Sequence, residues 1–166
     1  MIVFLIFFDT LTFKSYLKTA DSLFNFKNYS LSILYYRKAL EIDSTSPIAH
    51  NNLGLAYKEK KYLSLAEKEF KKAIKFAPLF YKAYINLGNL YFERKRFSDA
   101  ESCYKMAERL KPNFPDLHWN FALFYEAKGD TMLAVRHWRK YIYLKREDFD
   151  ASVKFAEDRI KKLLKK

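Results

Sequence analysis

The chain has 166 residues, of which half are hydrophobic and 19% are aromatic, and its formal net charge is +12. This hydrophobic content excludes an intrinsically disordered chain, and only 3 glycines and 4 prolines exclude collagen-like and low-complexity classes. A single cysteine excludes an internal disulfide framework and a zinc site built from several cysteines.

The chain begins with an apolar N-terminal segment, residues 1–12, in which Ile2–Phe8 is uninterrupted. The run is shorter than the roughly 20 apolar residues that span a bilayer, and it lacks the basic start and cleavage site of a signal peptide. It could be the remnant of a longer membrane segment, a cap on the first helices, or an element that pairs with another chain. We favour the cap. The compartment stays open, with the cytoplasm favoured and membrane association as the alternative.

A repeat of 34 residues organises the rest of the chain. This step relates Gly54 to Gly88 and Pro78 to Pro112. Longer series at the same step are Ala66, Ala100 and Ala134; Tyr57, Tyr91 and Tyr125; Asn52, Asn86 and Asn120; and the aromatic set Phe70, Tyr104 and Trp138. Within each unit, small and apolar residues recur with helical spacing, which predicts two amphipathic helices. One helix pair cannot bury both faces, so neighbouring pairs must stack.

The expected units are residues 13–46, 47–80, 81–114 and 115–148, followed by a terminal helix, 149–166. The first unit is divergent: Thr19, Ala20 and Leu23 stand where the second has Leu, Gly and Tyr. In the fourth, Ala122 replaces the glycine. In the second unit, small residues at Gly54 and Ala66 would let the two helices approach closely.

These units resemble the tetratricopeptide repeat (TPR) family, whose signature is W-x₂-L-G-x₂-Y…A-x₃-F…P at this period. Residues 47–80 and 81–114 match it closely, with His50 and Tyr84 in place of the tryptophan. The resemblance implies an all-α, right-handed α-solenoid of antiparallel helix pairs with a C-terminal capping helix. It also implies a non-catalytic adaptor or scaffold that binds an extended peptide or partner helix of another protein in a concave groove.

Family geometry implies that the first helix of each pair lines this groove. The row Asn52, Asn86 and Asn120 could hold a peptide backbone, because an amide side chain both donates and accepts hydrogen bonds. The alternative is solvated asparagine without a ligand. The other expected groove residues are Asn51, Asn89, Lys18, Lys82, Phe92, Trp119 and Leu123. The aromatic members would anchor a partner unless the rest of the fold covers them.

One subclass of the family grips a C-terminal carboxylate with lysine and asparagine side chains. Carried over to this chain, Leu17 and Asp21 stand where the first lysine and asparagine are needed. We therefore do not expect a carboxylate clamp.

The turns between paired helices carry a second row, Lys27, Lys61 and Lys95, with Gly129 as its fourth member. Glycine there indicates a left-handed turn, in which lysine should lose up to about 1 kcal/mol of stability. Together with Lys60, Arg94 and Arg96, these lysines predict a basic edge. This edge could bind nucleic acid or anionic membrane, or be ordinary solvated surface. Self-assembly into a homo-oligomer through the N-terminus or the solenoid ends is a further alternative.

Residues with reactive side chains are few. We expect His50 and His118 to be packing residues that are too far apart to share a metal. His137 has no carboxylate one turn away, and Cys103, without a histidine at a helical step, is expected to be a buried thiol. No phosphate loop or catalytic motif is present, so we expect no metal, no cofactor and no enzymatic activity.

Overall fold

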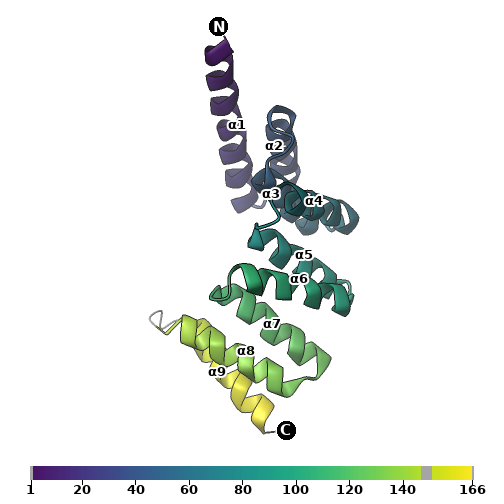
Figure 1. Cartoon of the computed structure of the whole chain (residues 1–166), viewed down its shortest axis with the longest axis vertical. Helices are drawn as coiled ribbons and strands as arrows, with labels where there is room; N and C mark the ends of the chain where they lie inside the picture. The colour runs from purple at the N-terminus through teal and green to yellow at the C-terminus, as the bar shows by residue number, and fades with distance from the viewer. Residues whose placement is uncertain (1, 147–150, 166) are drawn as a thin grey trace. The chain divides into compact units, whose positions relative to one another are not determined.

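The structure, a computed structural model, describes residues 2–146 and 151–165, with side chains from Thr10 onward. Every regular element within these ranges is an α-helix (Figure 1). The helices are α1 (Ile2–Asn25), α2 (Tyr29–Ile42), α3 (Pro47–Glu59), α4 (Leu63–Phe76), α5 (Tyr81–Glu93), α6 (Phe97–Leu110), α7 (Pro115–Lys128), α8 (Thr131–Leu144) and α9 (Ala151–Leu164). Each expected repeat contains two of them, so the helical-repeat solenoid class is confirmed.

The chain forms two compact units, Met1–Leu90 (the N-unit) and Tyr91–Lys166 (the C-unit), with the boundary inside α5. In the N-unit, α1 packs on α2, α2 on α3, and α3 on α4. In the C-unit, α6 packs on α7, α7 on α8, and α8 on α9.

Local sequence chemistry sets where several helices begin. The side chains of Asn28, Ser46 and Asp130 each accept a hydrogen bond from a backbone N–H in the first turn of α2, α3 and α8. Pro47 and Pro115 occupy the first positions of α3 and α7, where no helical N–H bond is lost. These residues stabilise the first turns of the helices that they precede or begin.

The turns within the four pairs share one backbone conformation. Lys27, Lys61 and Lys95 have φ of 59°, 63° and 58°, and Gly129 has φ of 78°. The left-handed turn expected from Gly129 is thus confirmed at all four positions.

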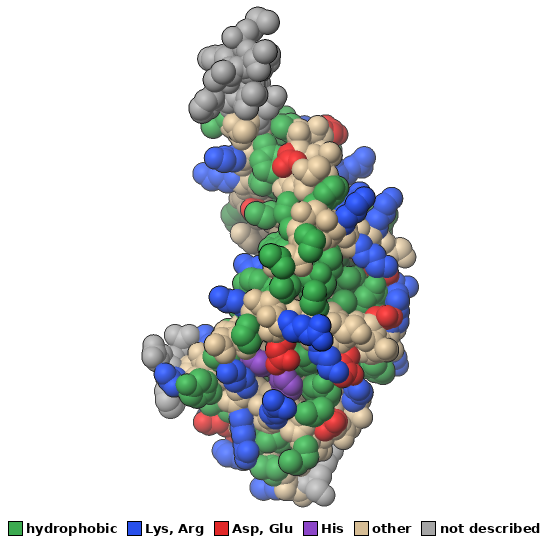
Figure 2. All heavy atoms as spheres, viewed as in Figure 1, with side chains coloured by type: hydrophobic (Ala, Val, Ile, Leu, Met, Phe, Trp, Pro, Cys, Tyr) green, Lys and Arg blue, Asp and Glu red, His purple; other side chains and the backbone are tan. Residues whose placement is uncertain are grey.

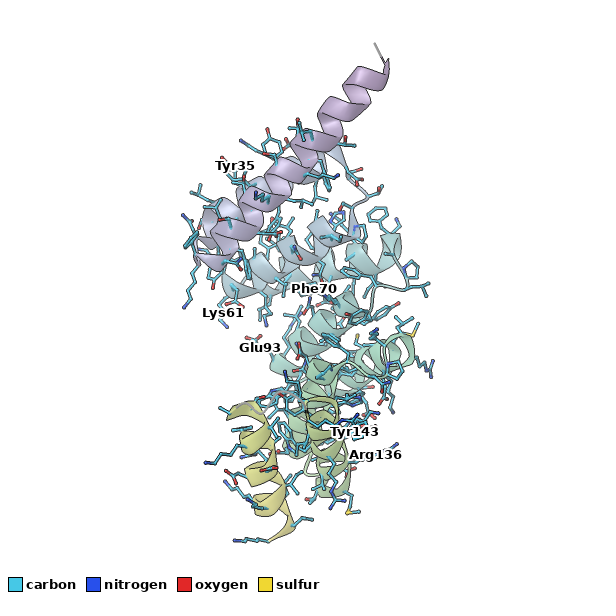
Figure 3. The ribbon with its side chains drawn as sticks, turned by 90° about the vertical axis from the view of Figure 1, so that its left-hand side faces the viewer. Tyr35, Lys61, Phe70, Glu93, Arg136 and Tyr143 are labelled. Atoms are coloured by element: carbon cyan, nitrogen blue, oxygen red, sulfur yellow. The ribbon has the colours of Figure 1, made fainter. Side chains whose placement is uncertain are left out.

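The second pair shows why a small residue is needed between the helices. A Cβ on Gly54 of α3 would lie 2.6 Å from Cε1 of Phe70 on α4. The Phe70 ring is fully buried and lies among the helices in Figure 3. Close approach at Gly54 is therefore confirmed.

The N-terminal segment continues as helix into the first repeat. Residues 2–12 belong to α1 without a break at the expected boundary. No helix in the described ranges is long and apolar enough to cross a membrane. The roles of this segment as a cap or an assembly element stay predictions.

Helix α9 lies where the terminal helix was expected, although residues 149, 150 and 166 fall outside the described ranges. The Phe155 ring stacks on Trp119 of α7, with ring centroids 5.2 Å apart. Arg159 forms an ion pair with Glu126, whose carboxylate also accepts a hydrogen bond from Trp138 Nε1 at 2.5 Å. Hydrogen bonding to Glu126 raises the pKa of Arg159. The end of the C-unit is thus closed by both aromatic and ionic contacts.

Candidate functional site

A hollow of about 300 Å³ opens in the N-unit beside three helices. Its lining residues are Asp21, Phe24 and Asn25 of α1, Tyr36 of α2, and Asn52 and Leu55 of α3. The three from α1 share one face because side chains three and four positions apart are neighbours on a helix. The hollow therefore combines polar groups with apolar surface.

Asp21 is the polar centre of this hollow. Its Oδ1 accepts a hydrogen bond from the Tyr36 hydroxyl at 2.6 Å and another from Asn52 Nδ2 at 3.1 Å. Burial, followed by the hydrogen bond to Asp21, raises the pKa of Tyr36, so this phenol stays a donor. Both bonds go to Oδ1, which leaves Oδ2 with its capacity to accept.

A chain of amides continues from Asn52. Its Oδ1 accepts a hydrogen bond from Asn51 Nδ2 at 3.1 Å, and Asn51 Oδ1 accepts one from Asn86 Nδ2 at 2.8 Å. The sequence analysis predicts that Asn51 lies at the groove surface. In the structure Asn51 is buried, with 4% of its surface exposed. Asn51 lies beneath the surface because it bridges two members of the asparagine row. Asn52 and Asn86 are thereby brought together.

The other expected groove residues differ in exposure. Lys18 and Lys82 are exposed, and Asn89 and Asn120 are partly buried. Phe92 packs edge-on against Phe124 at 5.8 Å between ring centroids.

Trp119 and Leu123 belong to a hydrophobic cluster with Trp138 and Tyr141. The three expected apolar anchors, Phe92 among them, are thus engaged within the C-unit. The capping helix and the paired helix cover positions that the sequence suggested were open.

The residues of the expected basic edge are exposed, three in each unit. Lys27, Lys60 and Lys61 belong to the N-unit, and Arg94, Lys95 and Arg96 to the C-unit. Arg96 pairs with Asp99 at 2.7 Å and lies 4.2 Å from the centroid of the Tyr91 ring. Figure 2 shows basic side chains interspersed with acidic and apolar ones.

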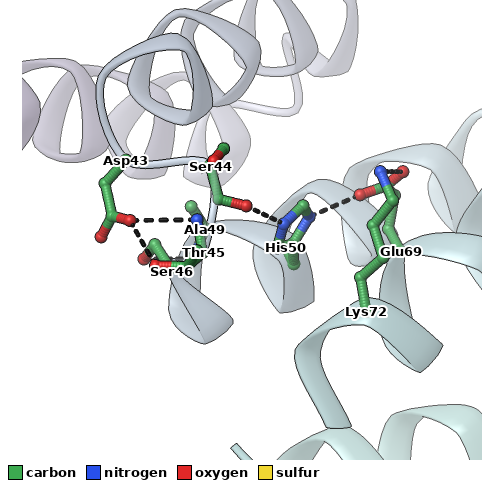
Figure 4. Close-up of polar contacts among 8 residues, drawn as sticks. All are labelled: Asp43, Ser44, Thr45, Ser46, Ala49, His50, Glu69 and Lys72. Atoms are coloured by element: carbon green, nitrogen blue, oxygen red, sulfur yellow. Dashed lines mark hydrogen bonds and ion pairs between the residues drawn. The ribbon is translucent and has the colours of Figure 1, made fainter. Parts of the chain in front are cut away.

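His50 is a buried packing residue with a polar role that the sequence did not reveal (Figure 4). Its Nε2 donates to the carbonyl oxygen of Ser44 at 3.0 Å, and its Nδ1 lies 2.6 Å from Oε2 of Glu69. Lys72 holds the other carboxylate oxygen at 3.0 Å. Burial opposes ionisation of Glu69, but the hydrogen bonds from His50 and Lys72 prevail and lower its pKa.

The C-unit brings together three residues that the sequence analysis kept apart. His118 Nδ1 lies 3.1 Å from His137 Nδ1, and Glu108 is close to both. A search for carboxylates along one helix missed the cluster because its members come from α6, α7 and α8. The available signal was the separation of 19 residues that relates both His50 to Glu69 and His118 to His137. Cys103, expected to be buried, is partly exposed.

Three family models match the chain. Two described as tetratricopeptide repeat match residues 48–78 and 81–114, and one described as TPR repeat matches residues 20–61. Together they cover more than half of the sequence. The comparison with curated proteins gave no significant match.

Solved structures give the same fold. PilF of Pseudomonas aeruginosa has a TM-score of 0.83 at 23% identity, over 94% of this chain and 69% of its own. TTC0263, a thermophilic TPR protein of Thermus thermophilus, has a TM-score of 0.77 at 20% identity, over 91% and 80%. The first TPR of Spaghetti (RPAP3), bound to the HSP90 peptide SRMEEVD, has a TM-score of 0.68 at 21% identity, over 72% and 94%.

Proposed function

The chain belongs to the tetratricopeptide repeat family and has the fold of a protein–protein interaction scaffold, and we propose that it binds an extended peptide segment of a partner protein in the hollow of the N-unit. Stacked repeats offer extended surfaces suited to this purpose. The observation that carries the proposal is the Asp21–Asn52 pair in a hollow that also presents the apolar side chains of Phe24 and Leu55.

The chemistry of the hollow selects the kind of peptide. Asn52 and Asn86 are held in place by hydrogen bonds, so their remaining capacity is oriented toward a peptide backbone at little entropic cost. The Asp21 carboxylate favours a positively charged group. A lysine or arginine of the peptide could place its methylene groups against Phe24 and Leu55 and its charge at Asp21.

The same carboxylate disfavours an acidic peptide. The RPAP3 repeat is bound to the HSP90 peptide SRMEEVD, in which three of the last four residues are acidic. An acidic peptide in the hollow of this chain would bring its carboxylates near Asp21, which would repel them. We therefore propose a basic or neutral peptide as the ligand.

A displayed peptide library selected against the whole chain would supply the ligand for a binding measurement. Calorimetry would then compare wild type with Asn52→Ala, Asp21→Asn and the matched control Asn113→Ala, an exposed asparagine outside the hollow. We expect Asn52→Ala to weaken binding by roughly 3- to 10-fold, the loss of about one hydrogen bond. Asp21→Asn should remove the preference for basic residues.

Equal affinity for wild type and Asn52→Ala would contradict the proposal. A measurement at high salt separates it from the basic-edge alternative, because binding through lysines weakens steeply with ionic strength. Binding of nucleic acid that is lost in Lys27→Glu/Lys61→Glu, but kept in Asn52→Ala, would assign the function to the basic residues instead.

A further inference from the structure

Glu108 near the end of α6, His118 in α7 and His137 in α8 form a compact cluster within the C-unit. Both histidines are buried, with 2% and 8% exposed, and Glu108 is partly buried. The two Nδ1 atoms lie 3.1 Å apart, and one ligand atom of each residue lies within 4.8 Å of the others.

The hydrogen bonding of His118 fixes which nitrogen faces the cluster. Its Nε2 lies 2.8 Å from the carbonyl oxygen of Pro112, which can only accept, so Nε2 carries the hydrogen. In the neutral ring, Nδ1 of His118 then carries a lone pair and accepts the hydrogen bond from Nδ1–H of His137. For both Nδ1 atoms to bind one metal ion, the hydrogen of the neutral His137 ring would move to its Nε2. Histidines that bind metals usually donate their other ring N–H to a backbone carbonyl or carboxylate in this way. Burial also lowers the pKa of both rings, to about 4 in His137, which favours the neutral, ligating form.

Comparison with the second repeat shows what is unusual about this cluster. There, His50 occupies the position of His118, and Glu69 occupies that of His137. The Glu69 carboxylate satisfies His50 and is itself held by Lys72. In the fourth repeat a second imidazole replaces this carboxylate, so two ring nitrogens face each other.

Glu108 supplies the carboxylate that the fourth repeat lacks. The other repeats place an aliphatic residue at the position of Glu108, namely Leu40, Ile74 and Ile142. Among the described residues, no lysine or arginine forms an ion pair with Glu108. The sequence therefore departs from its own repeat pattern at Glu108, and the fold places this carboxylate beside the two histidines.

We propose that Glu108, His118 and His137 bind one divalent transition-metal ion, with Zn²⁺ as the preferred ion. Two imidazole nitrogens and one carboxylate oxygen form a set that Zn²⁺ favours, with a fourth position for water or another ligand, whereas Mg²⁺ and Ca²⁺ favour oxygen ligands alone. Bonds of about 2.0–2.2 Å place two ligand atoms on one ion roughly 3–4 Å apart. The two histidine nitrogens already have this spacing. Rotation of the partly exposed Glu108 side chain would bring its carboxylate oxygen to the same distance from them.

Two cations beside the cluster act against binding. Arg136 and Lys140 of α8 interact electrostatically with His118. Their positive potential would repel a metal cation, and the Glu108 carboxylate opposes them. Loss of this carboxylate should therefore weaken binding both by removing a ligand and by raising the local positive charge.

The test is calorimetric titration of Zn²⁺ into the full chain, prepared without a polyhistidine tag and stripped of metal with a chelator. We expect one ion per chain. Glu108→Ile and His118→Gln should each weaken binding by more than about tenfold, since even loss of a supporting residue around a metal has effects of this size. Glu101→Gln, which removes a different carboxylate from the same helix, should leave binding unchanged. Glu108→Ile restores the residue type of two other repeats, so we expect it to fold, with circular dichroism as the check.

A second measurement does not depend on the variants. In imidazole nitrogen NMR spectra of wild type, Zn²⁺ should shift the resonances of His118 and His137 and leave those of His50 in place. Absence of saturable binding to wild type would overturn the proposal. So would binding that is unchanged in Glu108→Ile, or Zn²⁺-induced shifts confined to His50.

Discussion

Lysine at three turns adopts a conformation in which its side chain is a disadvantage. Lys95 has φ of 58°, and the equivalent residue of the last repeat is Gly129, with φ of 78°. Glycine has no Cβ to clash in the left-handed region, although it also gives the unfolded chain more freedom. The balance of these effects can be measured at a single residue.

We expect Lys95→Gly to raise the free energy of unfolding by about 0.5–1 kcal/mol, because it relieves the left-handed strain. Urea denaturation followed by circular dichroism would measure the change. The matched control is Lys60→Gly, since Lys60 lies in an equivalent turn with φ of −79° and should gain nothing. Equal effects of the two substitutions would show that the turn conformation is not the cause.

Glu101 provides a residue whose ionisation should contribute to stability. Hydrogen bonds from Lys105 and Lys128 lower its pKa from 4.5 to about 2. Below pH 4.5 the unfolded chain therefore takes up a proton that the folded chain does not. The stability contribution is fully present above pH 4.5 and is lost as the pH falls toward 2.

We expect the thermal midpoint of wild type to fall more steeply through this acid range than that of Glu101→Gln, which cannot titrate at this position. Differential scanning calorimetry at a series of pH values would measure both profiles. Parallel profiles would contradict the assigned role of the two lysines.

At the scale of helices, the second repeat depends on close approach between α3 and α4. Gly54 faces the ring of Phe70, and an added methyl group would lie 2.6 Å from a ring carbon. The fully buried ring has little room to move away. Substitutions at Gly54 and Phe70 can therefore test whether these signature residues stabilise the repeat through their packing.

We predict that Gly54→Ala destabilises the chain by about 1–3 kcal/mol through overpacking. Because the clash is with the ring, the double variant Gly54→Ala/Phe70→Leu should be less destabilised than the sum of the two single variants. Chemical denaturation of the four proteins of this cycle would measure the coupling. Additive effects would mean that the methyl group and the ring do not meet.

The helices could be predicted because each depends on local signals. Pro47, Ser46 and Gly129 mark ends in sequence as they do in structure. The polar contacts between helices could not be predicted from such local signals. His118 meets His137 across α7 and α8, and Asn51 bridges to Asn86 in α5, so their partners follow from packing rather than from periodicity.

At the scale of the whole chain, the repeat period predicted the fold, and the helices form two compact units. The boundary falls within α5, inside a repeat that matches the family signature closely. A repeat is a unit of sequence, whereas a compact unit depends on which helices pack together. Packing between helices also determines what the expected asparagine row does. Asn52 and Asn86 are both hydrogen-bonded to the buried Asn51, so part of the row contributes to the structure of the N-unit.

The proposed function depends on one contact surface of this chain, the hollow around Asp21 and Asn52. Site-specific photo-crosslinking to the selected peptide tests this most directly. Benzoylphenylalanine would replace Asn25, an exposed residue of the hollow, or Leu65, an exposed residue of α4, as the control. We predict crosslinking from position 25 alone, abolished by excess unlabelled peptide. Equal crosslinking from both positions, or crosslinking from position 65 only, would contradict a binding site in the N-unit hollow.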